Sequence, residues 1–286
     1  MLINGKKIAN NLLAILKKER KTIKKRIGLS VFLIGNAPEQ LSFVKIKSEM
    51  AKELKIDFKL IHLIKTPNFI DFANLLKKEV FNPDVTGIII QQPLPAQLST
   101  DSIYDYIPLL KEIEGHRKKT EFTFPLGLAV MTIIKYIYDG KRKEDIIFVD
   151  LKRDRLLFKN ILKSKKVIVV GRGITGGKPI GNTLGNLNVN YISINSTTSD
   201  PESYFITADL IITATGKKVI TPAMLKPGVV LINTGVRKEN GRLKGDYEEK
   251  EIKDIASFYT PTPGGSGPID VVYLYKNLID AAKMQK

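Results

Sequence analysis

The sequence contains no cysteine, and His62 and His116 are its only histidines among 286 residues. Without cysteine, the chain can form no disulfide, zinc–thiolate site or iron–sulfur cluster, and it has no cysteine nucleophile. Two histidines are also too few for a histidine-rich metal site, so we expect no metal centre. The lack of cysteine fits a reducing compartment.

Long apolar runs are absent as well. No window approaches the roughly 20 apolar residues of a membrane-spanning helix. The opening residues, MLINGKKIAN, lack the apolar core of a signal peptide. We therefore expect a soluble, cytoplasmic protein that does not act at a membrane. With 43% hydrophobic and 26% charged residues, the chain can bury one large core or two ordinary ones, and disorder is not expected.

Acidic residues are outnumbered, which gives the chain a formal net charge of +17. The basic excess is spread evenly over both halves and consists of 37 lysines against 9 arginines. Base readout and bidentate phosphate contacts favour arginine. The charge therefore indicates a solvated lysine-rich surface that attracts anionic small molecules, rather than a nucleic-acid footprint. A basic RNA-associated protein on an α/β scaffold is kept as an alternative.

Short β-branched runs alternate along the chain with segments of helical period. Continuous apolar strands separated by helices are typical of parallel sheets covered on both faces. The predicted fold class is α/β, with two α/β domains, parallel sheets in both and a cleft between them. The predicted strands cover residues 29–34, 58–64, 85–91, 166–170, 189–194, 208–214, 229–233 and 257–260.

A helix that begins at Pro125 separates two groups of strands. We expect one domain to comprise residues 1–124 together with 269–286, and a second to comprise residues 125–268. Residues 141–163 are heavily charged, and we interpret them as an insertion or linker in the second domain, with a hairpin or short helix of its own.

The segment GRGITG, residues 171–176, satisfies the pattern G-x-G-x-x-G between a predicted strand and a predicted helix over 177–187. Glycines permit a tight turn and let backbone N–H groups approach a pyrophosphate closely. Hydroxyl side chains stand about 20 residues on, where an NAD enzyme has a carboxylate. Together with Arg172 they suit NADP better than NAD. The motif alone is weak, so a turn without a ligand is the alternative.

Lys47 falls on the apolar face of a predicted helix, in step with Phe43, Met50 and Leu54. A desolvated lysine loses proton affinity and can act as a base. The alternative, favoured by this helix alone, is a lysine that extends its ammonium into water. Gln91 changes the balance, because it ends an apolar strand before a Pro-Leu-Pro turn and places an amide at the carboxyl end of the sheet.

Two further segments bear on binding. Glu112 and Glu114 would flank the same crevice if the chain returns to it, although such residues are more often part of a solvated loop. The stretch FYTPTPGGSGPID places a Pro/Gly-rich loop before a last helix that runs from Ile269 towards Met284. So much backbone constraint suits close approach to a flat ligand.

The order of these motifs resembles the bifunctional methylenetetrahydrofolate dehydrogenase/cyclohydrolase family. The most specific pieces are VTGIIIQQPLP, the VVGRG and GKP loop, and TPTPGGSGP, and the match covers nearly the whole chain except about 141–163. The resemblance implies a folate-binding catalytic first domain and a Rossmann-like, NADP-binding second domain, with NAD not excluded. It also implies tetrahydrofolate derivatives as substrates, a role in one-carbon metabolism, and a homodimer formed through the second domain.

The resemblance also assigns roles to residues of the first domain and the last loop. Lys47 takes the position of the catalytic lysine, and Gln91 matches the glutamine that steers it. The positions implied to bind the substrate are Phe43, Glu114, Pro263, Gly264 and Gly265.

In the second domain, Gly171, Arg172 and Gly173 correspond to the family's dinucleotide turn. Ser196 and Val236 take positions that border the cofactor.

Departures from the family pattern identify a divergent member. Phe43 replaces a tyrosine whose hydroxyl helps to orient the lysine, and Gly173 removes a hydroxyl from the cofactor turn. Glu114 replaces an aspartate, and its extra bond moves the carboxylate by roughly 1.5 Å. Hydride transfer mainly needs orientation, whereas hydrolysis needs Lys47 as proton acceptor, so we expect hydrolysis to be the more impaired step. A folate- or nucleotide-binding paralogue without turnover is the alternative.

Overall fold

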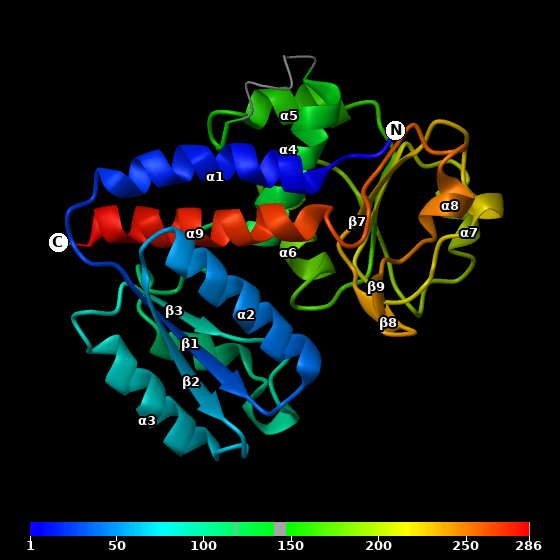
Figure 1. Ribbon diagram of the computed structural model, residues 1–286. Helices are drawn as coiled ribbons and strands as arrows, with labels where there is room; N and C mark the ends of the chain where they lie inside the picture. Colours follow the sequence, from blue (N-terminus) through cyan, green and yellow to red (C-terminus); the bar gives the residue numbers. More distant parts are fainter. Residues whose placement is uncertain (118, 140–146, 286) are drawn as a thin grey trace. The chain divides into compact units, whose positions relative to one another are not determined.

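The structure is a computed structural model that describes residues 1–117, 119–139 and 147–285 (Figure 1). These residues divide into two compact units. The five-stranded unit comprises Met1–Leu13 and Leu126–Asp270, and the three-stranded unit comprises Ala14–Pro125 and the residues from Val271 onward. The α/β fold class with parallel sheets is confirmed, while the domain boundaries given above stay a prediction.

The three-stranded unit is built on a parallel sheet in the order β2-β1-β3. The central strand β1 (Gly28–Ile34) is buried along its whole length, as is β3 (Gly87–Ile90), whereas the edge strand β2 (Asp57–Leu63) is partly exposed. Figure 1 shows α2 (Pro38–Glu53) and α3 (Phe69–Val80) on either side of this sheet. Burial on both faces explains why β1 and β3 are apolar without alternation.

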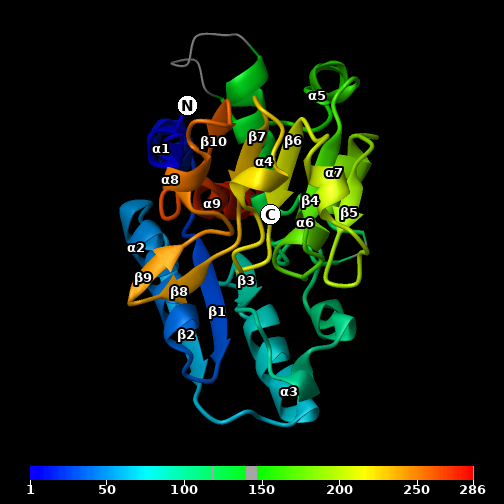
Figure 2. The ribbon, with the colours of Figure 1, turned by 90° about the vertical axis from the view of Figure 1, so that its right-hand side faces the viewer.

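The five-stranded unit holds a parallel sheet in the order β10-β7-β6-β4-β5 (Figure 2). The chain leaves β4 for β5 on one side and later returns to β6 on the other, so the topological switch point lies between β4 and β6. In open α/β sheets, ligands bind at the carboxyl ends of the strands at such a point. The strands are β4 (Val167–Val170), β5 (Ile192–Ile194), β6 (Leu210–Thr213), β7 (Val230–Asn233) and β10 (Phe258–Tyr259).

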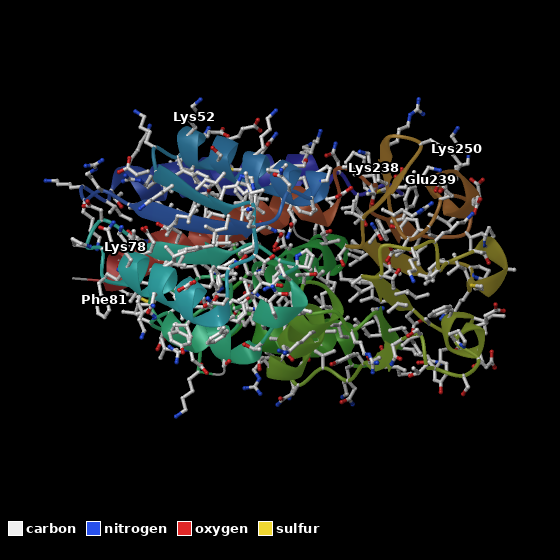
Figure 3. All side chains as sticks on the ribbon, turned by 90° about the horizontal axis from the view of Figure 1, so that it is seen from below. Lys52, Lys78, Phe81, Lys238, Glu239 and Lys250 are labelled. Atoms are coloured by element: carbon white, nitrogen blue, oxygen red, sulfur yellow. The ribbon has the colours of Figure 1, made fainter. Side chains whose placement is uncertain are left out.

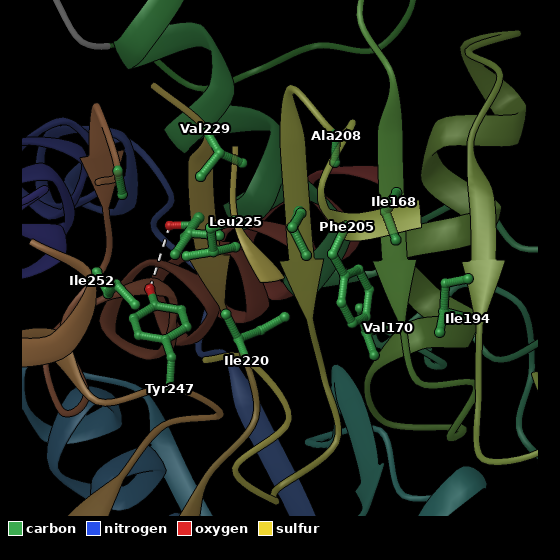
Figure 4. Close-up of a cluster of buried hydrophobic side chains, with 13 residues drawn as sticks. Ile168, Val170, Ile194, Phe205, Ala208, Ile220, Leu225, Val229, Tyr247 and Ile252 are labelled. Carbon is green, nitrogen blue, oxygen red and sulfur yellow. Dashed lines mark hydrogen bonds between the residues drawn. The ribbon is translucent and has the colours of Figure 1, made fainter. Parts of the chain in front are cut away.

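Apolar side chains from these strands and the helices around them form a buried cluster (Figure 4). Ile168 and Ile211 are fully buried on adjacent strands, and Phe205, 2% exposed, is supplied by α7 (Glu202–Phe205). Tyr247 inserts its ring into the same cluster, and its hydroxyl donates to Thr260 O at 2.7 Å. The sheet is thereby a rigid base for the loops at its carboxyl edge.

The remaining helices connect these layers. α1 and α9 each contribute residues to both units, and α4 and α6 belong to the five-stranded unit. The remaining helical segments are short. The bounds are α1 (Gly5–Lys21), η1 (Ala96–Leu98), η2 (Asp101–Tyr106), α4 (Pro125–Tyr138), α5 (Arg155–Leu162), α6 (Gly177–Asn186), η3 (Pro222–Met224), α8 (Glu249–Ile252) and α9 (Ser266–Met284).

All eight predicted strands are found, although the run 189–194 is a strand only from Ile192. The antiparallel hairpin of β8 (Arg237–Glu239) and β9 (Arg242–Lys244) was not predicted, because its residues are mostly charged. Within the segment interpreted as an insertion, α5 is the expected short helix, while residues 140–146 lie outside the described residues.

Lysines lie at the surface of both units. Lys52, Lys78, Lys238 and Lys250 are exposed and extend outward from both units (Figure 3). Among the described residues, no helix has the length and apolar character that crossing a bilayer requires.

A pair of glycines tests the packing of α4 against α6. A Cβ added at Gly127 would lie 1.9 Å from Thr183 Oγ1, whereas one at Gly185 would meet nothing within 4 Å. We expect Gly127→Ala to destabilise the protein by about 1–3 kcal/mol through overpacking. Gly185→Ala is the matched control and should stabilise the protein by about 0.5–1 kcal/mol through helix propensity. Urea unfolding measures both, and an unchanged midpoint for Gly127→Ala would contradict the packing described.

Candidate functional site

Lys47 and Gln91 meet at the carboxyl end of the three-stranded sheet. Gln91 follows β3 directly and is 7% exposed, and Lys47 reaches it from α2. Lys47 Nζ donates to Gln91 Oε1 at 2.7 Å, and Gln91 Nε2 donates to Gln92 O at 2.9 Å. The second bond fixes the carboxamide with its oxygen towards the ammonium. The ammonium of the half-buried Lys47 is therefore bonded to Gln91, and its role as a base stays a prediction.

Two further contacts hold α2 in place beside this pair. Gln40 Nε2 donates to Pro93 O at 2.7 Å, which ties the start of α2 to the turn after Gln91. The hydroxyl of Tyr275, a fully buried residue of α9, donates to Lys47 O at 2.5 Å. Burial raises the pKa of Tyr275, so its hydroxyl stays protonated and remains a donor. This contact could not be predicted from the sequence, because its partners are 228 positions apart.

Phe43 lies one helical turn before Lys47 in α2 and is 43% exposed. Residues four positions apart share a helix face. The ring is thus not a core residue, and it offers a flat apolar surface beside the lysine.

The two glutamates of the KEIEG segment have different roles. Glu112 is 1% exposed, and its carboxylate accepts N–H bonds from Glu114 (3.0 Å), Gly115 (3.1 Å), His116 (2.8 Å) and Arg117 (3.3 Å). The expectation that Glu112 flanks the crevice is wrong, because its carboxylate is taken up by this turn.

The turn places Glu114 close to the end of β3. Ile88 and Glu112 form a parallel bridge, and Ile88 N donates to Lys111 O at 2.8 Å. Glu114 therefore follows, by two residues, the position at which the chain bridges to β3. That Glu114 lies beside the Lys47–Gln91 pair stays a prediction.

An aromatic pair that the sequence did not single out links the Glu112 turn to the segment after β3. The His116 ring stacks on Tyr104 at 4.4 Å between centroids, with 25° between their planes. Gln92 Nε2 donates to the Tyr104 hydroxyl at 2.7 Å, and Gln92 Oε1 accepts from Leu94 N at 3.0 Å. Both segments that flank the candidate catalytic pair are therefore tied together.

In the five-stranded unit, the glycine-rich turn lies between β4 and α6, as predicted. Gly171 has φ +105°, and a Cβ there would lie 2.6 Å from Ala214 O. A Cβ at Gly177 would lie 1.8 Å from Gly171 O, so both positions require glycine. A Cβ at Gly173 would meet nothing within 4 Å, which shows that this glycine is not required by packing.

A cavity of about 210 Å³ opens beside this turn. The cations of Arg172 and Lys178 line it near the N-terminus of α6, where the helix dipole favours anions. Lys178 and Ser193 are lining residues that the sequence did not single out. The residues that line it are Gly171, Arg172, Gly177, Lys178, Asn182, Tyr191 and Ser193, none of which is acidic.

The other residues expected at the cofactor lie in nearby loops. Ser196 is exposed in the turn after β5 and is not among the residues that line the cavity. Val236, 41% exposed, follows β7.

The Pro/Gly-rich loop is held by its glycines and its two ends. Gly264 has φ +102°, and a Cβ at the buried Gly265 would lie 2.6 Å from Pro261 O. Pro263 is exposed, while Ser266 Oγ at the start of α9 donates to Asn233 O at 2.9 Å. The loop therefore has a fixed backbone with an exposed surface at Pro263, which suits contact with a ligand.

Comparison with known proteins gives a consistent result over the chain. The model described as tetrahydrofolate dehydrogenase/cyclohydrolase, catalytic domain, matches residues 3–114, and the NAD(P)-binding domain of the same family matches residues 155–286. The bifunctional protein FolD of Bacillus licheniformis is 33% identical over 99% of this chain and 97% of its own length. That of Bacillus subtilis is 31% identical with the same coverage.

Solved structures are similar over 99% of this chain. The bifunctional FolD methylenetetrahydrofolate dehydrogenase/cyclohydrolase from Campylobacter jejuni has a TM-score of 0.84, 26% identity and 99% coverage of its own chain. The Trypanosoma brucei enzyme, solved with NADP cofactor and an inhibitor, has a TM-score of 0.85, 21% identity and 97% coverage. The latter likeness shows the fold.

Two buried glutamates in the three-stranded unit should respond oppositely to pH. Burial raises the pKa of Glu112, although the backbone N–H bonds oppose it. For Glu79, burial also raises the pKa, but bonds from Lys59 and Ser30 outweigh it and the pKa is lowered. The stabilisation from Glu112 is thus complete below the ordinary value of 4.5 and declines as pH rises above it. That from Glu79 is complete above 4.5 and declines as pH falls.

We therefore expect Glu112→Gln to lower the free energy of unfolding, and this difference from the wild type should become smaller between pH 4.5 and pH 7. The loss in Glu79→Gln should instead grow as pH rises from about 3.5 to 5. Urea unfolding across this range measures both, and parallel trends for the two variants would contradict the assignment.

Proposed function

This chain belongs to the tetrahydrofolate dehydrogenase/cyclohydrolase family, and on that premise we propose which of its residues carry the two reactions. It is an enzyme that oxidises 5,10-methylenetetrahydrofolate to the 5,10-methenyl compound with NADP and hydrolyses this product to 10-formyltetrahydrofolate. The proposal concerns the residues, and the observation that carries it is the bond between Lys47 and Gln91.

Lys47 is proposed as the base that takes a proton from the water attacking the methenyl carbon. An ammonium has three N–H donors, and Gln91 accepts one. Because Gln91 is neutral, Lys47 can lose a proton without leaving an unpaired carboxylate behind. Attack of water on the methenyl cation requires a base that takes one proton from that water. Gln91 orients the amine and so acts as its steering partner.

Phe43 and Glu114 are proposed to bind the pteridine. The exposed ring of Phe43 can stack on a flat heterocycle one helical turn from Lys47. The Glu114 carboxylate can accept paired N–H bonds from the guanidine-like pterin edge. The backbone of Glu114 is held by the Glu112 carboxylate, which accepts a hydrogen bond from Glu114 N at 3.0 Å. Pro263, Gly264 and Gly265 are proposed to contact the substrate with their fixed backbone.

NADP is proposed to lie along the glycine-rich turn, held by Gly171, Arg172 and Gly173, with Ser196 and Val236 at its borders. The local structure fits this group, because Gly173 borders open space at the turn and because the residues that line the cavity include two cations and no carboxylate. The lack of an acidic lining residue and the two nearby cations suit an added phosphate more than a ribose diol. When bound, NADP accepts a hydride from the methylene carbon.

We further propose a homodimer formed through the five-stranded unit, a cytoplasmic location and no nucleic-acid partner. β5 is an edge strand of its sheet with partly exposed residues, which leaves an edge that a second copy can cover. A sequence without cysteine fits the cytoplasm. Light scattering on the purified protein measures the mass in solution.

Lys47→Met should abolish the base while keeping an apolar stem of similar length. We expect the rate of methenyltetrahydrofolate hydrolysis to fall by about 100-fold or more, and the dehydrogenase rate to fall less. Lys45→Met is the matched control, since Lys45 is exposed on the same helix, and it should leave both rates within about twofold. Methenyl absorbance follows both reactions. Equal losses in the two variants would contradict the role given to Lys47.

Arg172→Ala should weaken the binding of NADP⁺ more than the binding of NAD⁺. Loss of one charge-assisted bond to phosphate corresponds to about a 10- to 100-fold rise in KM for NADP⁺. Arg242→Ala, in the exposed strand β9, removes the same charge elsewhere and should change neither KM. The measurement is the initial dehydrogenase rate with each dinucleotide, and an equal rise for both would show that Arg172 does not read the extra phosphate.

A further inference from the structure

A buried carboxylate holds the loop that follows β6. Asp246 has no exposed surface, and each of its oxygens accepts one backbone N–H. Thr215 N donates to Oδ2 at 2.8 Å and Gly216 N donates to Oδ1 at 2.9 Å. A carboxylate is costly to bury unless hydrogen bonds compensate it, so these amides and Asp246 stabilise one another.

The loop held by Asp246 forms the surface on which the glycine-rich turn lies. A Cβ at Gly171 would lie 2.6 Å from Ala214 O, and one at Gly176 would lie 2.9 Å from Ala214 Cβ. These contacts join the loops after β4 and β6, which are the strands on either side of the switch point. Asp246 therefore holds the loop on which the glycine-rich turn packs, at the switch point where ligands of such sheets bind.

Asn233 is the last residue of β7, and both ends of its side-chain amide form hydrogen bonds in the same region. It is 3% exposed, and its Oδ1 accepts from Thr213 Oγ1 at 2.9 Å and from Asp246 N at 3.0 Å. Its Nδ2 donates to Gly235 O and to Thr262 Oγ1, both at 2.7 Å. The amide has two N–H donors and two lone pairs, so all four are used.

The contacts of Asn233 reach both loops expected to touch ligands. Gly235 precedes Val236 at the cofactor border, and Thr262 precedes Pro263 in the Pro/Gly-rich loop. The backbone of Asn233 reinforces the second link, because its N–H donates to Thr260 Oγ1 at 2.8 Å and its carbonyl accepts from Ser266 Oγ at 2.9 Å. One buried amide thus sets the spacing between a cofactor loop and a substrate loop.

We propose that Asp246 and Asn233 are positioning residues of the dehydrogenase reaction, Asp246 for the cofactor loops and Asn233 for the register between the cofactor and substrate loops. The inference rests on the proposed NADP and folate sites. Both side chains are buried and act through the loops that they hold. Hydrolysis consumes no cofactor, so it depends on Asp246 far less than hydride transfer does.

The first test is Asp246→Asn, which has the same shape but turns an NH₂ group towards one of the two backbone N–H donors. We expect KM for NADP⁺ to rise by about tenfold or more, as for one unsatisfied buried group, with KM for methylenetetrahydrofolate and the hydrolysis rate within about threefold. Asp209→Asn is the matched control. Asp209 accepts Lys166 N at 2.7 Å in the segment before β6, away from the crevice loops, so it should lower stability and change neither KM.

The second test separates the substrate link. Thr262→Val removes the hydroxyl that accepts from Asn233, and we expect KM for methylenetetrahydrofolate to rise by about fivefold or more. Thr262→Ser keeps the hydroxyl and should restore the wild-type value. Asn233→Ser breaks both links and should raise KM for NADP⁺ and for the folate together.

A purely structural role predicts another pattern, in which activity falls with the amount of folded protein while each KM stays at its wild-type value. That pattern, or Asp246→Asn and Asp209→Asn behaving alike, would overturn the inference. Because KM does not depend on the concentration of active enzyme, a partly folded variant still gives an answer. If the wild-type protein itself fails to oxidise methylenetetrahydrofolate with NADP⁺, the assigned function fails instead.

Discussion

The 2.7 Å bond between Lys47 and Gln91 is the contact on which the chemistry proposed for the three-stranded unit depends. The bond suits this chemistry because the Gln91 amide carries no charge. Lys59 in the same unit bonds to the Glu79 carboxylate at 2.6 Å, and an anionic partner stabilises the charged lysine. An amide oxygen orients an amine without binding its charge. The same bond in an ion pair would hold the proton that hydrolysis needs to move.

Both units position their functional loops by burying polar groups against backbone amides. Glu112 does so for the segment that carries Glu114, and Asp246 does so for the loop after β6. A buried carboxylate is tolerated only where its hydrogen bonds are satisfied. Here the groups that satisfy it belong to the loops that must stay fixed. The stability of the carboxylate and the geometry of the loop therefore depend on the same bonds, and neither can be lost alone.

The parts of the fold that the sequence predicts are those with a local cause. Buried parallel strands are continuous apolar runs in the sequence. The turn after β4 requires glycine at position 171, because the backbone there has a positive φ. The contacts that position the site have no such signal. The hydrogen bond from Tyr275 to Lys47 joins residues 228 positions apart, and the one from Thr215 to Asp246 joins residues 31 positions apart. In the sequence, Asp246 and Glu112 resemble any acidic loop residue, and only the folded chain shows which N–H groups reach them.

Two of the departures from the family pattern, at Phe43 and Gly173, remove hydroxyls and leave the backbone geometry in place. Gly173 O still accepts from Gly176 N and Lys178 N, both at 3.1 Å, so the cofactor turn closes without a side chain at that position. Phe43 keeps a ring beside Lys47, and Gln91 still orients the ammonium. Binding and orientation of the substrate and cofactor depend on many such backbone contacts, whereas proton transfer depends on the orientation of a single amine. We therefore expect a lost hydroxyl beside that amine to affect hydrolysis more than hydride transfer.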